Sequence, residues 1–184
     1  QRSEGAESAL DLLDFIATAV FHDAPRREGF RPSPLWEIEK AQYIQTLRKT
    51  IEQLDANSAG WTPIAFEQQF GTAGLPPVVI IIGDEEVRLR GIIDRVDRYG
   101  NGDIRVIDYK TGGGSLEKAD LERGYWLQLP IYGMVAQYAM KLGQVVDGFY
   151  WKINAASPSA LKLSTFKHLG SEGPEAAYDL ALDH

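Results

Sequence analysis

The segment 91–112 (GIIDRVDRYGNGDIRVIDYKTG) carries the residues best suited to chemistry, two aspartates and a lysine. Asp108 and Lys110 are two positions apart on a predicted strand, so their side chains project from the same face. Asp94 lies on the preceding strand. Such charges at the end of a buried sheet face are costly unless they have a partner or a task. Hard carboxylate oxygens suit Mg²⁺ or Mn²⁺, which can polarise a phosphate and activate water, while the lysine adds positive charge to the transition state.

The length of the hairpin loop decides whether Asp94 joins the other two. Asn-Gly between two β-branched runs is a strong hairpin signal. A two-residue loop at 101–102 would pair Asp94 with Tyr109, whereas a three-residue loop at 100–102, or one bulge, places Asp94 opposite Asp108. We expect the second register because it best separates an apolar face from a polar one. The apolar face would hold Ile92, Val96, Ile104 and Val106, and the polar face Arg95, Asp97 and Arg105, with Arg98 near the solvent-exposed tip.

The rest of the chain predicts a mixed α/β fold around this hairpin. Pro130 must start or kink a helix. Helical patterns occupy 8–21, 35–55 and 116–142, with a loop over 25–34 and a short helix near 174–182 in a tail expected to fray. Strand patterns occupy 64–70, 78–82 (expected to be buried), 86–98, 104–110 and 145–154, with a weaker edge strand at 161–166.

Composition excludes several classes of function. The 184 residues suit a single domain, and no apolar run is long enough to span a membrane. The chain has no Cys, so disulfides, thiolate metal sites and iron–sulfur clusters within it are excluded. A net charge of −7 and a pI near 5.0 argue weakly against non-specific nucleic-acid binding, although local patches decide such contacts. The first residue is Gln, which is expected if the chain is a fragment of a longer protein.

Three sequence blocks in order resemble a known family. They are Gly91-x-x-Asp94-Arg95-x-Asp97, then Ile107-Asp108-Tyr109-Lys110-Thr111-Gly112, then Gln128-Leu129-Pro130-x-Tyr132. Together they resemble the RecB-like nuclease domains of the PD-(D/E)XK superfamily, found in helicase–nuclease complexes. The resemblance runs from about Leu35 to Trp151. The Asp-x-Lys core alone is common, and the specificity comes from the order of the three blocks.

The resemblance implies a restriction-endonuclease-like core, in which a central mixed β-sheet is flanked by helices and its hairpin carries the active site. It implies that residues 1–34 are a helical extension and loop, 35–168 the nuclease core and 169–184 a polar tail. Site roles also follow from it. Asp94 and Asp108 would bind the metal, with the main-chain carbonyl of Tyr109 as a further ligand, and Lys110 would be the catalytic lysine.

Three more site residues are implied by the same resemblance. Gln128 and Tyr132 match a Gln-x-x-x-Tyr motif, and would contact DNA or position the active site from one helix face. Glu67 falls where the family often has a supporting glutamate. For Gln128 and Tyr132 the alternative is a helix cap and a core tyrosine. For Glu67 it is an ordinary exposed strand residue.

The implied activity is Mg²⁺- or Mn²⁺-dependent hydrolysis of DNA phosphodiester bonds. An exonuclease acting on single-stranded ends is expected, working beside a helicase in cytoplasmic DNA repair and recombination. One departure from the family is the absence of an upstream metal-binding histidine block, since His22 lacks the preceding pattern. A binding or assembly module that retains the nuclease fold is therefore an alternative, and an unrelated metal-dependent hydrolase is a weaker one.

Arginines and aromatic residues near the hairpin leave two further alternatives open. The arginines could bind phosphate or form a solvated face of paired charges. The aromatic residues could stack on unpaired bases or pack in the core. The arginines are Arg88, Arg90, Arg95, Arg98 and Arg105, and the aromatic residues are Trp61, Tyr125, Trp126 and Trp151. His22, His168 and His184 are expected at the surface.

Overall fold

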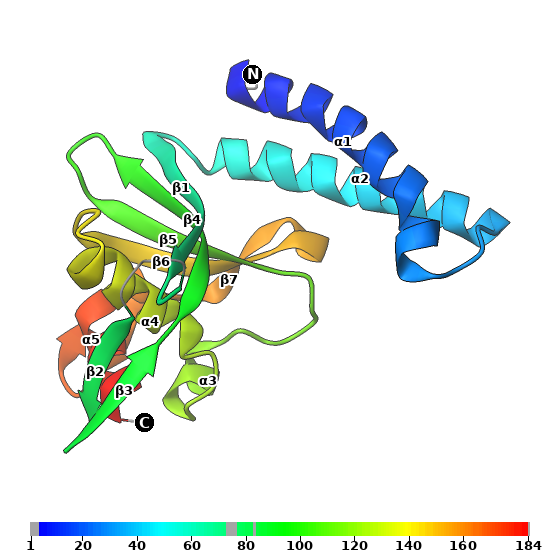
Figure 1. Ribbon diagram of the computed structural model, residues 1–184. Coiled ribbons are helices and arrows are strands. Elements are labelled where there is room, and N and C mark those ends of the chain that lie inside the picture. Colours follow the sequence, from blue (N-terminus) through cyan, green and yellow to red (C-terminus); the bar gives the residue numbers. More distant parts are fainter. Residues whose placement is uncertain (1–3, 73–76, 83, 184) are drawn as a thin grey trace. The chain divides into compact units, whose positions relative to one another are not determined.

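The computed structural model describes residues 4–72, 77–82 and 84–183. They form two compact units, one that holds the residues up to Ala59 together with Lys152–Ser157, and one that holds Gly60–Trp151 and the residues from Pro158 onward (Figure 1). The expected strand turn at 83–85 and the histidine at position 184 include residues outside this description. In the described part of the chain, no helix is both long and apolar enough to cross a membrane.

The first unit is a helical hairpin. Helix α1 spans Glu4–Glu28 and helix α2 spans Pro34–Ala56. Edge-to-face ring contacts join them, with Trp36 lying 5.5 Å from Phe21 and 5.0 Å from Phe30 between ring centroids. The predicted loop over 25–34 is wrong at its start, because the helix continues through Pro25 to Glu28. A proline costs less there than in mid-helix, since few residues follow it before the helix ends. A short 3₁₀ turn, η2 (Ile153–Ala155), belongs to the same unit.

The second unit is built on a five-stranded sheet in the order β1-β4-β5-β6-β7. Its strands are β1 (Trp61–Phe70), β4 (Gly91–Tyr99), β5 (Ile104–Lys110), β6 (Val145–Lys152) and β7 (Ser157–Lys162). The remaining elements are α3 (Lys118–Glu122), α4 (Gln128–Met134), the π-helix η1 (Val135–Ala139), the 3₁₀ turn η3 (Leu163–Thr165), the short strands β8 (Lys167–His168) and β9 (Ser171–Glu172), and α5 (Pro174–Asp183).

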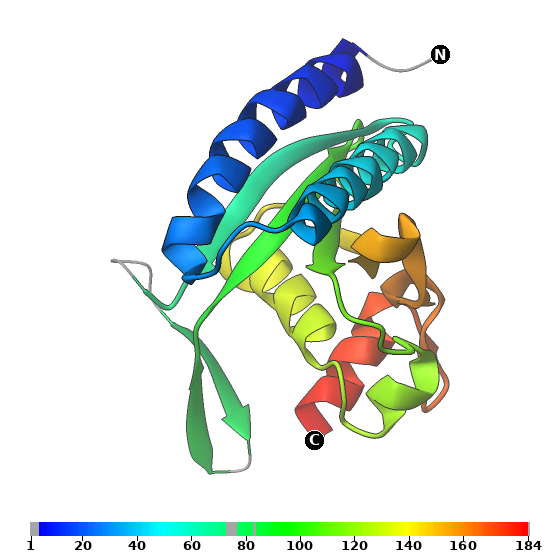
Figure 2. The ribbon, with the colours of Figure 1, turned by 90° about the vertical axis from the view of Figure 1, so that its right-hand side faces the viewer.

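The hydrophobic core lies between this sheet and helices α4 and α5, which cover the same face of it (Figure 2). Side chains of β4, β5 and β6 meet those of the helices there, and many of them are fully buried. The mixed α/β class, with a central sheet flanked by helices, is confirmed. The expectation of a frayed tail is wrong in part, because α5 places Ala176, Ala177, Tyr178 and Leu180 in this core.

The strand predicted over 86–98 is two strands in different sheets. Strand β3 (Glu85–Leu89) pairs with β2 (Val78–Ile82) in a separate two-stranded sheet, and β4 pairs with β1. The ladders stop at Phe70 opposite Gly91 and resume at Val78 opposite Leu89, so residues 71–77 face Arg90 alone. A ladder cannot keep one register across such an insertion. The expected burial of β2 is also wrong, since its outward side chains Val79 and Ile81 are exposed.

Two other boundaries differ from expectation. The helical pattern over 116–142 is divided into α3, α4 and η1, separated by a turn at Arg123–Leu127. Pro130 lies in the first turn of α4, where its missing N–H costs nothing, so it starts a helix as one of the two alternatives required. The edge strand lies at Ser157–Lys162, four residues before the predicted one, and Leu163–Thr165 form a 3₁₀ turn.

The β4–β5 hairpin has the expected register. Val96 pairs with Val106 and Asp97 with Arg105, around a loop at 100–102 closed by a hydrogen bond from Gly102 N to Tyr99 O of 2.9 Å. Gly102 has a φ of +98°, a conformation that glycine adopts without steric cost. Continued by two pairs, this register sets Asp94 opposite Asp108.

The expected apolar face is wrong at one position. Ile92 is exposed, and its neighbour Ile93 is buried in the core instead. The alternation of side chains breaks at Asp94, opposite which Glu67 of β1 has a φ of +47°. A non-glycine residue in this left-handed region bends the local ladder, so side chains on either side of it no longer alternate regularly.

Candidate active site

Asp108 of β5 is the most deeply buried member of the predicted site, with 1% of its surface exposed. Its Oδ2 lies 2.6 Å from Nζ of Lys110. The ion pair is close but not aligned as a hydrogen bond, and this oxygen accepts none from the described residues. A buried carboxylate oxygen is thus left with one neighbouring charge and unused lone pairs, which is unusual in a folded protein.

Burial raises the pKa of the Asp108 carboxyl above its ordinary value. The ammonium of Lys110 opposes this shift, whereas the negative charge of Asp94 adds to it. The two carboxylates are therefore close enough to repel each other. Any cation near both of them would relieve the repulsion.

Asp94 is held against β5 by a main-chain donor. The amide N–H of Tyr109 donates to Oδ2 of Asp94 over 2.7 Å. This bond fixes the side chain beside the strand that carries Asp108 and Lys110, in agreement with the expected register. The hydroxyl of Tyr109 extends to the opposite face, where Nη1 of Arg95 lies 3.5 Å away.

Lys110 begins a short hydrogen-bond chain into helix α4. Its Nζ donates to Oε1 of Gln128 over 2.8 Å, and Nε2 of Gln128 donates to the hydroxyl of Tyr132 over 2.7 Å. Gln128 and Tyr132 are four positions apart in α4 and share a helix face, as the sequence predicts. The ring of Tyr132 packs edge-to-face on Phe70, with centroids 5.9 Å apart. The structure thus joins the second and third sequence blocks through side chains.

Glu67 is not drawn into this cluster. Its side chain is exposed, and no hydrogen bond to the other predicted site residues is observed in the described part of the chain. It does lie opposite Asp94 in the β1–β4 ladder, in the left-handed conformation noted above. Its position is therefore adjacent to the site.

Tyr150 of β6 is a site neighbour that sequence reasoning missed. Nζ of Lys110 lies 5.3 Å from the centroid of its ring. No motif marks Tyr150, and only the alternation of β6, which turns Tyr150 toward the core, could have pointed to it.

The opposite face of the hairpin carries a buried ion cluster of Arg95, Asp97 and Arg105. Both carboxylate oxygens of Asp97 accept hydrogen bonds, from Nε of Arg95 at 2.5 Å and from Nε of Arg105 at 2.9 Å. The guanidinium of Arg105 also stacks on Trp61, 4.7 Å from the ring centroid. The expectations of a phosphate-binding surface and of a solvated face are both wrong for these two arginines, because they are buried and engaged.

The other arginines and aromatic residues divide between the alternatives. Arg98 is exposed near the tip, as expected, and bonds to the carbonyl of Leu142. Trp151 is fully buried, which agrees with core packing, whereas Tyr125 is 62% exposed, which does not. His22 is exposed, as expected, and far along the chain from the site residues.

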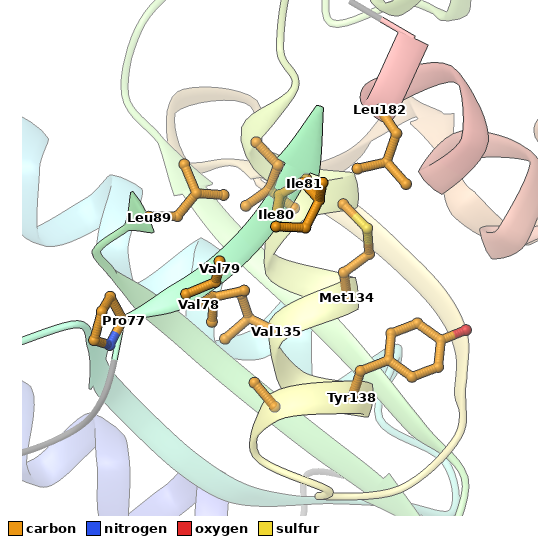
Figure 3. A pocket seen from close by; sticks show the side chains of 12 residues that line it. Pro77, Val78, Val79, Ile80, Ile81, Leu89, Met134, Val135, Tyr138 and Leu182 are labelled. Carbon is orange, nitrogen blue, oxygen red and sulfur yellow. The ribbon is translucent and has the colours of Figure 1, made fainter. Parts of the chain in front are cut away.

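An apolar groove of about 540 Å³ lies apart from this cluster, between strand β2 and the face formed by α4, η1 and the end of α5 (Figure 3). Its walls include Val79, Ile81, Met134, Tyr138 and Leu182. None of the predicted site residues lines it, and it contains no carboxylate, so the chemistry expected of the sequence does not belong there.

Metal ligation at the Asp94–Asp108 pair would rest on two carboxylates. Among the described residues, no group of three or more His, Cys, Asp or Glu side chains is arranged to hold a metal ion. The under-bonded Oδ2 of Asp108 and the repulsion between the two carboxylates nevertheless fit a hard cation. Mg²⁺ in particular is bound by one or two carboxylates while it retains several waters.

This fold, with an Asp on one hairpin strand and Asp-x-Lys on the next, defines the class of protein. The sequence matches the PD-(D/E)XK nuclease superfamily over residues 2–181, so the chain belongs to that superfamily. It is also similar to a large subunit of the ATP-dependent helicase/deoxyribonuclease of several bacteria. With that of Moorella thermoacetica it is 33% identical over 137 residues, which are 71% of this chain and 12% of the relative.

Two other relatives carry the same name. Identity is 32% over 149 residues with the protein of Geobacillus thermodenitrificans, covering 77% of this chain and 12% of that protein. It is 40% over 99 residues with the protein of Symbiobacterium thermophilum, covering 49% and 8%. The chain thus spans about an eighth or less of the length of these relatives. The resemblance to RecB-like nucleases is confirmed at the level of the family.

Proposed function

We propose that this chain is a metal-dependent nuclease domain that hydrolyses phosphodiester bonds in DNA. The observation that carries the proposal is the under-bonded carboxylate of Asp108, beside Lys110 and opposite Asp94, in a chain of the nuclease superfamily. A buried site with incompletely paired charge is where function is to be sought, since structural ion clusters are normally completed.

Asp94, Asp108 and the main-chain carbonyl of Tyr109 are the groups that would hold a divalent ion, Mg²⁺ or Mn²⁺. Such an ion supplies Lewis-acid polarisation of the scissile phosphate and a water of lowered pKa. The hydrogen bond from Tyr109 N occupies one oxygen of Asp94 and leaves the other for a ligand. Oδ2 of Asp108 is available in the same way, because no described donor is bonded to it.

Lys110 is proposed as the catalytic lysine. Its ammonium has three donors, and Gln128 and Asp108 engage two of its directions. A phosphate oxygen or the attacking water can take the remaining direction, where the positive charge would stabilise the negative charge of the transition state. Gln128 and Tyr132 orient the lysine through their hydrogen-bond chain.

The setting is proposed from the relatives. Their name couples a helicase to a deoxyribonuclease, so we propose that this domain works beside a helicase domain or subunit in DNA repair and recombination. A helicase delivers separated strands, which favours an exonuclease on single-stranded ends. The chain's charge of −7 agrees with a partner that supplies part of the electrostatic attraction for DNA.

A second candidate is a DNA-binding or assembly module that keeps the nuclease fold but hydrolyses little. The observation that favours it is the lack of a third acidic or histidine ligand among the described residues. A site with two carboxylates binds metal more weakly than one with three or four protein ligands.

The test is cleavage of end-labelled single-stranded DNA with Mg²⁺ or Mn²⁺, comparing wild type with Asp108→Ala. Asp183→Ala, which removes an exposed carboxylate at the end of α5, is the matched control. Metal-dependent cleavage by wild type and the control, absent in Asp108→Ala, supports the proposal. A circular single strand separates exonuclease from endonuclease action, and a duplex tests the strand preference.

The same assay distinguishes the two candidates. DNA binding without cleavage by wild type, with Mn²⁺ binding intact by calorimetry, favours the binding module. Equal cleavage by wild type and Asp108→Ala would overturn the site assignment.

A further inference from the structure

Tyr150 contacts both ends of the Lys110–Gln128 hydrogen bond, although it belongs to neither element that carries them. Its side chain is completely buried in the core. The hydroxyl donates to the carbonyl of Trp126 over 2.8 Å and accepts from the amide of Leu129 over 3.2 Å. Gln128 lies between these two residues in the chain, so the Tyr150 hydroxyl bridges the backbone on either side of it.

The start of α4 depends on such a support. The first N–H groups of a helix have no partner within it and are normally capped by a side chain. Leu127, at the cap position, provides no side-chain bond, and Pro130 has no N–H at all. Trp126 enters the helix with a φ of +60°, which a non-glycine residue adopts only when its surroundings hold it. The Tyr150 hydroxyl supplies the missing cap from a neighbouring strand.

The ring of the same tyrosine faces the site lysine. Nζ of Lys110 lies 5.3 Å from the ring centroid, within the range of a cation–π contact. The indole of Trp126 packs edge-to-face on the tyrosine ring, with centroids 5.8 Å apart. One rigid side chain therefore fixes the direction of the lysine and the backbone that presents its acceptor.

We infer that Tyr150 is a positioning residue for Lys110, acting through the first turn of α4 and through its ring. The inference rests on the proposed function, in which Lys110 stabilises the transition state. With the hydroxyl removed, the first turn of α4 loosens, and Oε1 of Gln128 no longer faces the ammonium in a single orientation. Small misplacements of this kind reduce turnover more than substrate affinity.

Tyr150→Phe is the variant that isolates the hydroxyl, because it retains the ring beside Lys110. We expect kcat for DNA cleavage to fall roughly tenfold, with KM within about twofold of wild type. Tyr150→Leu removes ring and hydroxyl together and is expected to lower kcat further. In the double variant Tyr150→Phe/Gln128→Ala, kcat should equal that of Gln128→Ala alone, because both changes break the same link.

Tyr178→Phe is the matched control. Tyr178 is also a buried core tyrosine, at 2% exposure, but its hydroxyl has no hydrogen-bond partner among the described residues. Removing it should leave both kcat and the melting temperature at or above the wild-type values. A loss of kcat shared by both Phe variants would mean that a general change in core packing, and not positioning, is responsible, and would overturn the inference.

A readout independent of cleavage completes the test. In ¹⁵N-labelled protein, the side-chain amide signals of Gln128 and the hydrogen exchange of the Leu129 amide should change in Tyr150→Phe and stay fixed in Tyr178→Phe. Unchanged signals in Tyr150→Phe would refute the positioning role, whether or not the chain cleaves DNA. Absence of metal-dependent cleavage by wild type would instead refute the proposed function, and the amide signals would still decide the role of Tyr150.

Discussion

Strands β4 and β5 carry two buried charge clusters on opposite faces, and the two are completed to very different degrees. On one face, Asp97 is fully buried and both its oxygens accept hydrogen bonds from Arg95 and Arg105. On the other, Asp108 is almost as buried, yet its Oδ2 has an unaligned lysine beside it and no hydrogen bond from the described residues. The same two strands thus hold a satisfied carboxylate and an unsatisfied one.

The difference separates a structural role from a functional one. Desolvating a carboxylate costs several kcal/mol, which a good ion cluster offsets by close pairing and by satisfying every lone pair. Asp97 meets that requirement with two guanidinium groups that also stack on aromatic rings. Asp108 does not, and its carboxyl pKa is raised as a result. Proteins tolerate such a cost mainly where a ligand will use the group.

The largest effect is expected for Lys110→Ala, which should lower DNA cleavage by about 10³-fold or more. The fold should survive, because Asp108 already has a raised pKa and can take up a proton when its partner is lost. Cleavage assays paired with thermal unfolding check both halves. An unfolded variant would mean that Lys110 is structural, and that the two clusters do not differ in kind.

Asp97→Ala should act in the opposite way. Removing the shared acceptor leaves two buried arginines without compensation, so we expect a loss of about 3 kcal/mol in the free energy of unfolding. Urea denaturation measures it, with Glu172→Ala, an exposed partner of Lys167, as the control expected to change little. A melting temperature equal to wild type would show that this cluster is not a structural one.

The sequence predicted the site better than its surroundings, for a physical reason. Asp94, Asp108 and Lys110 could be placed together because side-chain alternation and the hairpin loop determine their positions from local residues alone. Gln128 and Tyr132 needed only one helix turn. The roles of these residues remain predictions, whereas the geometry that brings them together agrees with the expected register.

What the sequence could not predict depends on contacts distant along the chain. The break at Arg90 depends on how β2 pairs with β3, and the burial of Arg95 and Arg105 depends on what each strand face meets. Alternating polar residues in β4 indicated a solvated face, yet mutual pairing allowed them to be buried. Tyr150 escaped notice because a buried tyrosine in a strand has no local signature beyond its alternation.

A smaller effect is expected for the stability of Asp108→Asn. A carboxyl with a raised folded-state pKa destabilises the fold above that pKa, where both folded and unfolded states are ionised. The variant should therefore unfold with about 1 kcal/mol more free energy at neutral pH. The advantage should shrink as the pH falls through the raised pKa, and vanish below the ordinary carboxyl value of 3.8, where wild-type Asp108 is protonated in both states.

Unfolding curves of both proteins between neutral and acidic pH provide this comparison, and Mg²⁺ sharpens it. Added Mg²⁺ should raise the wild-type melting temperature more than that of Asp108→Asn, because an ion uses the ionised carboxylate. An equal gain for the two proteins, or a variant that is less stable at every pH, would show that Asp108 is as well compensated as Asp97.

The smallest effect concerns Glu67, which stands opposite Asp94 with a φ of +47°. A non-glycine residue in this region costs about 1 kcal/mol, part of which glycine returns as lost chain entropy, so Glu67→Gly should add roughly 0.5 kcal/mol of stability. If the carboxylate supports the site, Glu67→Gln should slow cleavage by about three- to tenfold while leaving stability unchanged. Chemical denaturation and cleavage rates of the two variants give the answer. A gain in stability for the glycine variant with full activity in both would make Glu67 an ordinary exposed strand residue, and would confine the functional cluster to the two aspartates, the lysine and helix α4.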